Sequence, residues 1–177
     1  MSHSELASQF DIARARLLTV PSFICNAVVK LWLNAWPSFS RFGEACRGCP
    51  LGCGGRSDSI RHLLTCTRFR SSMNRICMYD ISLSPHACIG LFVSSSVLCT
   101  RMFCALYAVF MCCANYHRCK RDGIAISSNL DNINLFLNQR VRFAKQSSAN
   151  IRRAFELPLD GVVLRTQRAL VASHSII

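Results

Sequence analysis

The stretch ACRGCPLGCGGRSDSIRHLLTC, residues 45–66, places four cysteines and one histidine within 22 positions. Three residues separate Cys49 from Cys53, three separate His62 from Cys66, and eight lie between the two pairs. The first pair falls in a glycine-rich segment, where the backbone is free to turn both thiols toward one point. This feature constrains the fold most, because four ligands on one metal ion would fix a loop against the element that carries the second pair.

The second pair lies in a predicted helix over 58–78, where positions i and i+4 share one face. Ser57 is a suitable N-cap residue for this helix, and Asp58 would lie in the first turn, where negative charge is favoured. A loop pair facing a helix pair is typical of tetrahedral zinc sites, and three thiolates with one imidazole leave no open position. The sequence therefore predicts a structural Zn²⁺ site formed by Cys49, Cys53, His62 and Cys66.

Two alternatives to this ligand set stay open. Cys46 is a possible replacement for Cys53, because the spacing Cys46-x2-Cys49 is equally suitable for zinc. The other alternative is that these are free core cysteines near a chance histidine. Five candidate ligands in 22 residues, on a loop whose glycines and proline do not suit a core, argue against it.

Hydrophobic periodicity predicts a mainly α fold with five or six packed helices and one zinc-clamped Cys/His loop. Prolines and glycines divide the chain and mark the ends of the apolar runs. We expect helices over 4–19, 22–35, 58–78, two within 87–114, and 129–155, with a short element over 162–171. By region, these form N-terminal helices (1–42), a zinc-binding loop and helix (43–78), an apolar helical region with a basic helix (79–157), and a C-terminal tail (158–177).

The run 87–114 is almost wholly apolar and would be long enough to span a bilayer if Arg101 did not interrupt it. An arginine near the centre of a span costs about 2.5 to 3.5 kcal/mol on insertion scales. We therefore expect two packed core helices and no membrane partner. The cysteines outside the Cys/His stretch lie in apolar runs and are expected to be small buried hydrophobes, namely Cys25, Cys77, Cys88, Cys99, Cys104, Cys112, Cys113 and Cys119.

The chain carries 21 basic and 9 acidic residues, a formal charge of +12, which suits a polyanionic partner. Nucleic acid, either RNA or DNA, is the expected partner, with phosphate contacts from Arg47, Arg56, Arg61, Arg68 and Arg70 around the Cys/His stretch. The alternative is that these arginines form a solvated helix face. The N-terminal segment does not have the pattern of a secretory signal, which favours an intracellular location, nuclear or cytoplasmic. The oligomeric state stays open.

Residues 31–66, LWLNAWPSFSRFGEACRGCPLGCGGRSDSIRHLLTC, resemble the segment that follows the polymerase domain in non-LTR retrotransposon reverse transcriptases. In that family a helix ending in an Asn-x-Trp-like stretch leads through an Arg-containing turn to a Cys-x3-Cys loop, then an Asp, a Glu/Arg-His pair and a final Cys. The matching residues here are Leu31, Asn34, Trp36, Arg41, Cys49, Gly52, Cys53, Asp58, His62 and Cys66. Arg61 stands where the family usually has a glutamate before the histidine, which leaves the metal ligands intact.

The later stretch RMFCALYAVFMCCANYHRC is similar to the closing helix of that family through Tyr107, Asn115 and either His117 or Arg118. The resemblance covers about residues 23–119. It implies an accessory segment, because the polymerase reaction needs clustered carboxylates for two magnesium ions and the nine acidic residues here are scattered. We expect no enzyme activity and no catalytic residues. The expected function is a non-catalytic, zinc-binding and nucleic-acid-binding remnant of a retroelement reverse transcriptase, and the alternative is a structural or protein-interaction helical protein with a stabilising zinc.

Overall fold

The computed structural model describes residues 3–38, 48–55, 59–80, 90, 93, 95–125 and 130–159. Within these ranges the chain forms seven helices and no strand, which confirms the predicted mainly α fold. The predicted element over 162–171 and the C-terminal tail lie outside the described residues. The helices are α1 (His3–Leu17), α2 (Ser22–Trp32), α3 (Ile60–Thr65), α4 (Thr67–Cys77), α5 (Ser96–Arg121), α6 (Leu130–Ser147) and α7 (Ala149–Glu156).

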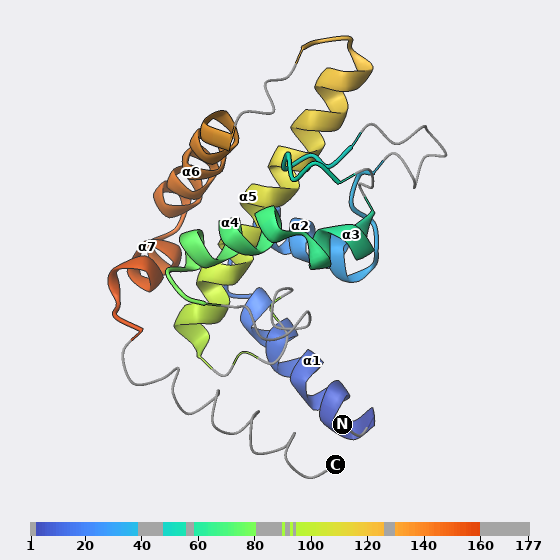
Figure 1. Ribbon diagram of the computed structural model, residues 1–177. Coiled ribbons are helices and arrows are strands. Elements are labelled where there is room, and N and C mark those ends of the chain that lie inside the picture. Colours follow the sequence, from blue (N-terminus) through green and yellow to red (C-terminus); the bar gives the residue numbers. More distant parts are fainter. Residues whose placement is uncertain are drawn as a thin grey trace.

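Helix α5 is the centre of the molecule, and α1, α2, α4, α6 and α7 all pack against it (Figure 1). The prediction of two helices within 87–114 is wrong, because one helix of 26 residues runs from Ser96 to Arg121. This segment contains neither glycine nor proline, so nothing in it interrupts the helix. Ser95 caps its start by accepting a 3.2 Å hydrogen bond from the backbone N–H of Leu98.

Arg101 lies on α5 inside the core, with only 3% of its surface exposed. Its guanidinium donates from Nε to the carbonyl of Ala154 (2.7 Å), from Nη1 to that of Cys77 (3.2 Å), and from Nη2 to that of Leu157. These carbonyls lie at the C-terminal ends of α7 and α4, where a positive charge is favoured. Arg101, the one charged residue of the apolar run, therefore links α5 to α4 and α7 through hydrogen bonds.

By length and composition alone, α5 could also cross a membrane, which is weak evidence for a span. The most apolar 18-residue window of the helix is 72% buried inside the protein. A core helix of a soluble protein has the same character, because it must be apolar around its whole circumference. Its burial against five other helices favours the core assignment made from the sequence.

Two predicted helices are each broken into a pair. The prediction 58–78 divides at Cys66 and the prediction 129–155 divides at Ser148, because both residues have extended backbone with ψ 123°. At the second break, the Ser148 hydroxyl accepts a hydrogen bond from the N–H of Ile151 and starts α7. Such side chains compete with the backbone for hydrogen bonds and therefore favour helix ends.

The segment after α2 folds back on the helix. Helix α2 ends at Trp32, three residues earlier than predicted, and Asn34 takes the left-handed conformation with φ 52°. Asparagine tolerates this conformation better than most residues. Trp36 is then buried, and its indole N–H donates to the carbonyl of Ala27 at 2.8 Å. This contact anchors the chain where it leads toward the Cys/His stretch.

The described cysteines outside the Cys/His stretch fit their predicted role as core residues, although two of them are only half-buried. Burial raises the pKa of Cys104 to about 12 and that of Cys99 to about 11, so both stay protonated and inert at neutral pH. Cys88 lies outside the described residues. Cys77, Cys99, Cys104, Cys112 and Cys113 are buried, and Cys25 and Cys119 are half-buried.

Candidate metal centre

Four side chains converge on one point, and each offers one ligand atom. The thiol sulfurs of Cys49, Cys53 and Cys66 and a ring nitrogen of His62 all lie within 4.8 Å of one another. The two sulfurs of Cys49 and Cys66 are 3.8 Å apart, and the sulfur of Cys53 is 3.2 Å from Nε2 of His62. Two thiolates bound to zinc at about 2.3 Å and at the tetrahedral angle lie about 3.8 Å from each other. The cluster therefore has the size of a tetrahedral metal site.

The loop 48–55 presents two sulfurs through its own backbone hydrogen bonds. The N–H of Cys49 donates to the carbonyl of Gly55 at 3.1 Å and closes the loop, and the N–H of Gly52 donates to the carbonyl of Cys49 at 3.0 Å. Two further N–H groups point at the sulfurs: Leu51 N lies 3.4 Å from Cys49 Sγ, and Gly55 N lies 3.3 Å from Cys53 Sγ. Donors aimed at sulfur stabilise the thiolate form that a metal needs.

Gly55 packs directly against the cluster, and a side chain at this position would displace the imidazole of His62. A Cβ atom at this position would lie 2.7 Å from Cε1 of His62 and 3.1 Å from the sulfur of Cys53. The first distance is below any normal carbon–carbon contact. Gly54 differs, since a Cβ there would meet nothing within 4 Å. Glycine is favoured at this position because the backbone is left-handed, with φ +78°.

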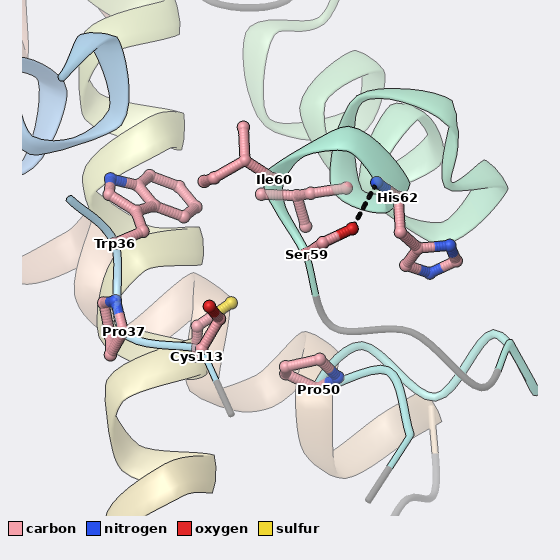
Figure 2. Close-up of a pocket in the computed structure, with 9 residues that line it drawn as sticks. Trp36, Pro37, Pro50, Ser59, Ile60, His62 and Cys113 are labelled. Carbon is pink, nitrogen blue, oxygen red and sulfur yellow. Dashed lines mark hydrogen bonds between the residues drawn. The ribbon is translucent and has the colours of Figure 1, made fainter. Parts of the chain in front are cut away.

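On the helical side, α3 is short and carries His62. Ser59 caps it, and its hydroxyl accepts a 3.1 Å hydrogen bond from the backbone N–H of His62, drawn as a dashed line in Figure 2. The predicted cap Ser57, with Asp58, lies outside the described residues, and the helix begins at Ile60. The cap therefore fixes the backbone of the residue that also supplies the imidazole.

The prediction that His62 and Cys66 share a face of one continuous helix is wrong. Cys66 is the residue between α3 and α4, and its backbone is extended (φ −70°, ψ 123°). The break turns its side chain into the protein, where only 2% of Cys66 is exposed. The two ligands still meet, because the change of direction brings the sulfur of Cys66 to that of Cys49.

The cluster rests on the core through one edge and reaches solvent through the other. Cys49 and Cys66 are buried, Leu51 next to them is 1% exposed, and Cys53 and His62 are half-buried. Figure 2 shows a small cavity behind the site, between Pro50 of the loop, Ile60 of α3, and Trp36 and Cys113 on the core side. The imidazole of His62 points away from Trp36 and Cys113.

The thiols of Cys49 and Cys66 act as a pair. Their hydrogen bond, together with burial, raises the pKa of Cys49 to about 12, and the same hydrogen bond lowers the pKa of Cys66. Cys49 is therefore protonated at neutral pH. A divalent cation that binds both as thiolates must displace that proton, so metal binding at this site releases protons.

Of the arginines predicted to contact phosphates, Arg61 is exposed on α3 beside His62, and Arg68 and Arg70 are half-buried on α4. Arg47 and Arg56 lie outside the described residues, as does the alternative ligand Cys46. The sequence interpretation missed Arg75, which is exposed in the last turn of α4. Arg75 follows Arg68 by seven residues, so the two lie near one side of the helix. This spacing could have predicted Arg75 from the sequence. Residues 59–79 contain four arginines and no acidic residue.

The sequence could also have predicted Ser59 as the cap of α3, because it stands three residues before His62 and is a preferred N-cap type.

No protein-family model, curated protein or solved structure matches this chain.

Proposed function

We propose that this protein is a non-catalytic nucleic-acid-binding module whose Cys49, Cys53, His62 and Cys66 bind a structural Zn²⁺. The observation that carries the proposal is a metal-sized Cys₃His cluster joined directly to two helices that carry arginines and no acidic residue. Zinc accepts this soft thiolate and imidazole set in tetrahedral geometry, whereas magnesium and calcium prefer oxygen ligands. The sequence resemblance supports an origin in the accessory region of a retroelement reverse transcriptase.

In this proposal the metal has a mechanical role. It holds the loop 48–55 against α3 and the start of α4, so Arg61 and Arg68 keep a fixed spacing. Arginine is suited to phosphate because its guanidinium can donate two parallel hydrogen bonds. Contacts of this kind would give affinity for the backbone without sequence choice.

A non-catalytic role is supported by the distribution of acidic residues. Among the described residues, the only group of three or more His, Cys, Asp or Glu side chains that could hold a metal is the Cys₃His cluster. A two-metal phosphoryl-transfer site needs several carboxylates around ions about 3.5 to 4 Å apart. We therefore expect no template-dependent extension of a primer in the presence of magnesium.

The salt dependence of oligonucleotide binding tests the proposal. Each phosphate contact contributes a slope of about −0.9 in log K against log salt for duplex and about −0.7 for single strands. We expect a total slope of roughly −2 to −4.5, corresponding to three to five contacts. The double variant Arg61→Ala/Arg68→Ala should reduce the slope by about one to two while zinc stays bound.

The matched control is Arg152→Ala/Arg153→Ala, which removes the same charge from exposed positions on α7. The proposal requires a larger loss from the α3–α4 pair than from the α7 pair. Equal losses would mean a diffuse charge effect, and a salt-insensitive interaction would contradict phosphate contacts at the zinc site.

A second candidate function is a structural or protein-interaction role. It is favoured by an open apolar hollow of about 310 Å³ between α1 and α2, where Phe10, Leu18 and Leu33 are 41%, 75% and 72% exposed. Large exposed apolar patches often mark protein contacts. Size-exclusion chromatography separates the candidates: a stable oligomer indifferent to oligonucleotides favours this second role, and a monomer that binds them favours the first.

A further inference from the structure

A row of aromatic rings follows the side of α5 where α2 and α6 flank it. Phe143 of α6 lies 5.6 Å from Phe23 of α2, measured between ring centroids, and Phe23 lies 4.9 Å from Tyr107 of α5. One helical turn before Phe143 on α6, the guanidinium of Arg140 lies 4.7 Å above the ring of Phe136. We call Phe23, Phe136, Phe143 and Arg140, with the adjacent Arg142 and with Lys30 of α2, the aromatic–cationic face.

The rings of this face are not sealed in the core. Phe143 is 48% exposed, and Phe23, Phe136 and Arg140 are half-buried. The planes of Phe23 and Phe143 are tilted by 49°, so these two rings do not stack face to face. An exposed ring with a cation nearby is the arrangement on which the bases of a single strand stack.

Acidic residues are few on the helices that form this face, and α6 carries one, Asp131 in its first turn. Helices α2 and α5 contain no aspartate or glutamate, and residues 132–155 of α6 and α7 contain five basic and no acidic residues. Lys30 and Arg142 are exposed, and Lys30 lies 5.4 Å above the ring of Phe110. A protein partner of apolar character would have to bury these cations, whereas a phosphate backbone complements them.

We propose that the aromatic–cationic face binds single-stranded nucleic acid, with an unpaired base stacked on Phe143 and the adjoining phosphates near Arg142 and Lys30. This goes beyond the proposed function, because the zinc-site arginines would contact any phosphate backbone and carry no preference for single strands. The α6 part of this face is separate from α3, since the two helices lie on opposite sides of α5 in Figure 1. A duplex keeps its bases stacked on each other and cannot use this face in the same way.

The test uses the zinc-loaded full chain and fluorescence anisotropy with a labelled 20-mer of oligothymidylate and a 20-base-pair duplex. The variant Phe143→Ala should weaken binding of the single strand about 5- to 140-fold, the factor for losing one stacked base, with less than about twofold change for the duplex. Phe143→Trp should retain single-strand binding, because it keeps an aromatic surface of larger area. The matched control is Leu135→Ala on the same helix, which removes a 58% exposed apolar side chain and should change binding less than about twofold.

The combined results separate this inference from the proposed function. If Phe143→Ala lowers only single-strand binding, and Phe143→Trp restores it, the aromatic–cationic face is supported whatever the effect of Arg61→Ala/Arg68→Ala. If the arginine variant loses both ligands and Phe143→Ala binds like the parent, the inference is overturned and the zinc-site function stands. If Phe143→Ala dissociates an oligomer of the protein and leaves oligonucleotide binding unchanged, the face is a protein contact and the inference is also overturned.

Discussion

The Cys/His cluster and the middle of α5 both place polar groups inside the protein, but they do so in different ways. In the cluster, four ligand atoms from a loop, a short helix and a helix break meet within 4.8 Å. In α5, Arg101 satisfies three carbonyls at the ends of α4 and α7, surrounded by apolar side chains. In our proposal the first region depends on a bound metal ion, whereas the second depends on contacts within the chain.

The two regions therefore differ in the source of their stability. Helix α3 has six residues and would be marginal in isolation, so the zinc that we propose would supply folding free energy there. Helix α5 is buried by its neighbours and needs no ligand. Removal of metal should therefore affect the first region more than the second.

The largest effect is expected from Cys66→Ser. Structural zinc contributes about 10 to 16 kcal/mol of apparent binding free energy in small zinc domains, and loss of a buried ligand removes most of it. We expect no zinc in the purified variant by elemental analysis and a loss of helical signal by circular dichroism that is limited to part of the total. Cys49→Ser, Cys53→Ser and His62→Ala should behave in the same way.

Cys25→Ser is the control for these ligand variants, since Cys25 is half-buried and lies outside the cluster. It should keep one equivalent of zinc. Complete unfolding of Cys66→Ser, α5 included, would break the contrast, because the core would then depend on the metal as well.

The next effect concerns the core. Arg101→Met should destabilise the protein by about 3 kcal/mol or more, because it leaves three carbonyls without their donor and each costs about 1 to 3 kcal/mol when buried. The stability of Arg101→Lys should lie between that of Arg101→Met and that of the parent, since one ammonium cannot reproduce the planar fork of a guanidinium. Urea denaturation at fixed zinc concentration measures both. Zinc content should be unchanged, and parent-like stability of Arg101→Met would show that the clamp on α4 and α7 is unnecessary.

Sequence reasoning was successful where one chemical rule dominates. The four residues that the structure brings together are the set predicted from spacing, which left Cys46 open as a replacement for Cys53, and the start of α2 at Ser22 follows from Pro21. It was wrong at Cys66 and Ser148, where helix patterns continue through residues that the structure holds extended. Apolar periodicity on both sides of such a residue looks the same whether the helix continues or bends, because the choice depends on tertiary contacts.

Arg101 is a second case in which tertiary contacts decide the helix boundaries, here by allowing a helix to continue. The sequence indicated that a charge in the apolar run argues against a membrane span, but it also suggested a break between two helices. The partners that make one continuous helix possible are carbonyls 24 and more than 50 residues away, and no local pattern reveals them. Gly55 is similar, since a side chain there would collide with the ring of His62, which lies seven residues later in the sequence.

A smaller effect is expected at Gly55. Gly55→Ala places a methyl group 2.7 Å from Cε1 of His62, so the imidazole must move away from the position in which it faces Cys53. Displacing one ligand in this way should lower zinc affinity about 10- to 100-fold, the range seen when groups that orient metal ligands are altered. Competition with a chromophoric chelator measures the change. Gly54→Ala is the control: it should cost about 1 kcal/mol of stability for its left-handed backbone and leave zinc affinity unchanged.

The smallest effect compares two helix caps. Ser59→Ala removes the acceptor for the N–H of His62, and Ser148→Ala removes the acceptor for the N–H of Ile151. Each should cost about 0.5 to 2 kcal/mol. Only Ser59→Ala should also weaken zinc binding, because its helix carries a ligand. Equal zinc affinity in the two variants, measured by the same competition assay, would show that α3 is ordered without help from its cap.

Zinc K-edge X-ray absorption on the purified protein reports directly which atoms bind the metal at the proposed site. We predict one equivalent of zinc with three sulfur ligands at about 2.3 Å and one nitrogen ligand at about 2.0 to 2.1 Å, contributed by Cys49, Cys53, Cys66 and His62. The nitrogen contribution should disappear in His62→Ala together with most of the metal. A shell of four sulfurs would replace His62 by a further cysteine such as Cys46, and a preparation with less than half an equivalent of zinc would contradict the proposed site.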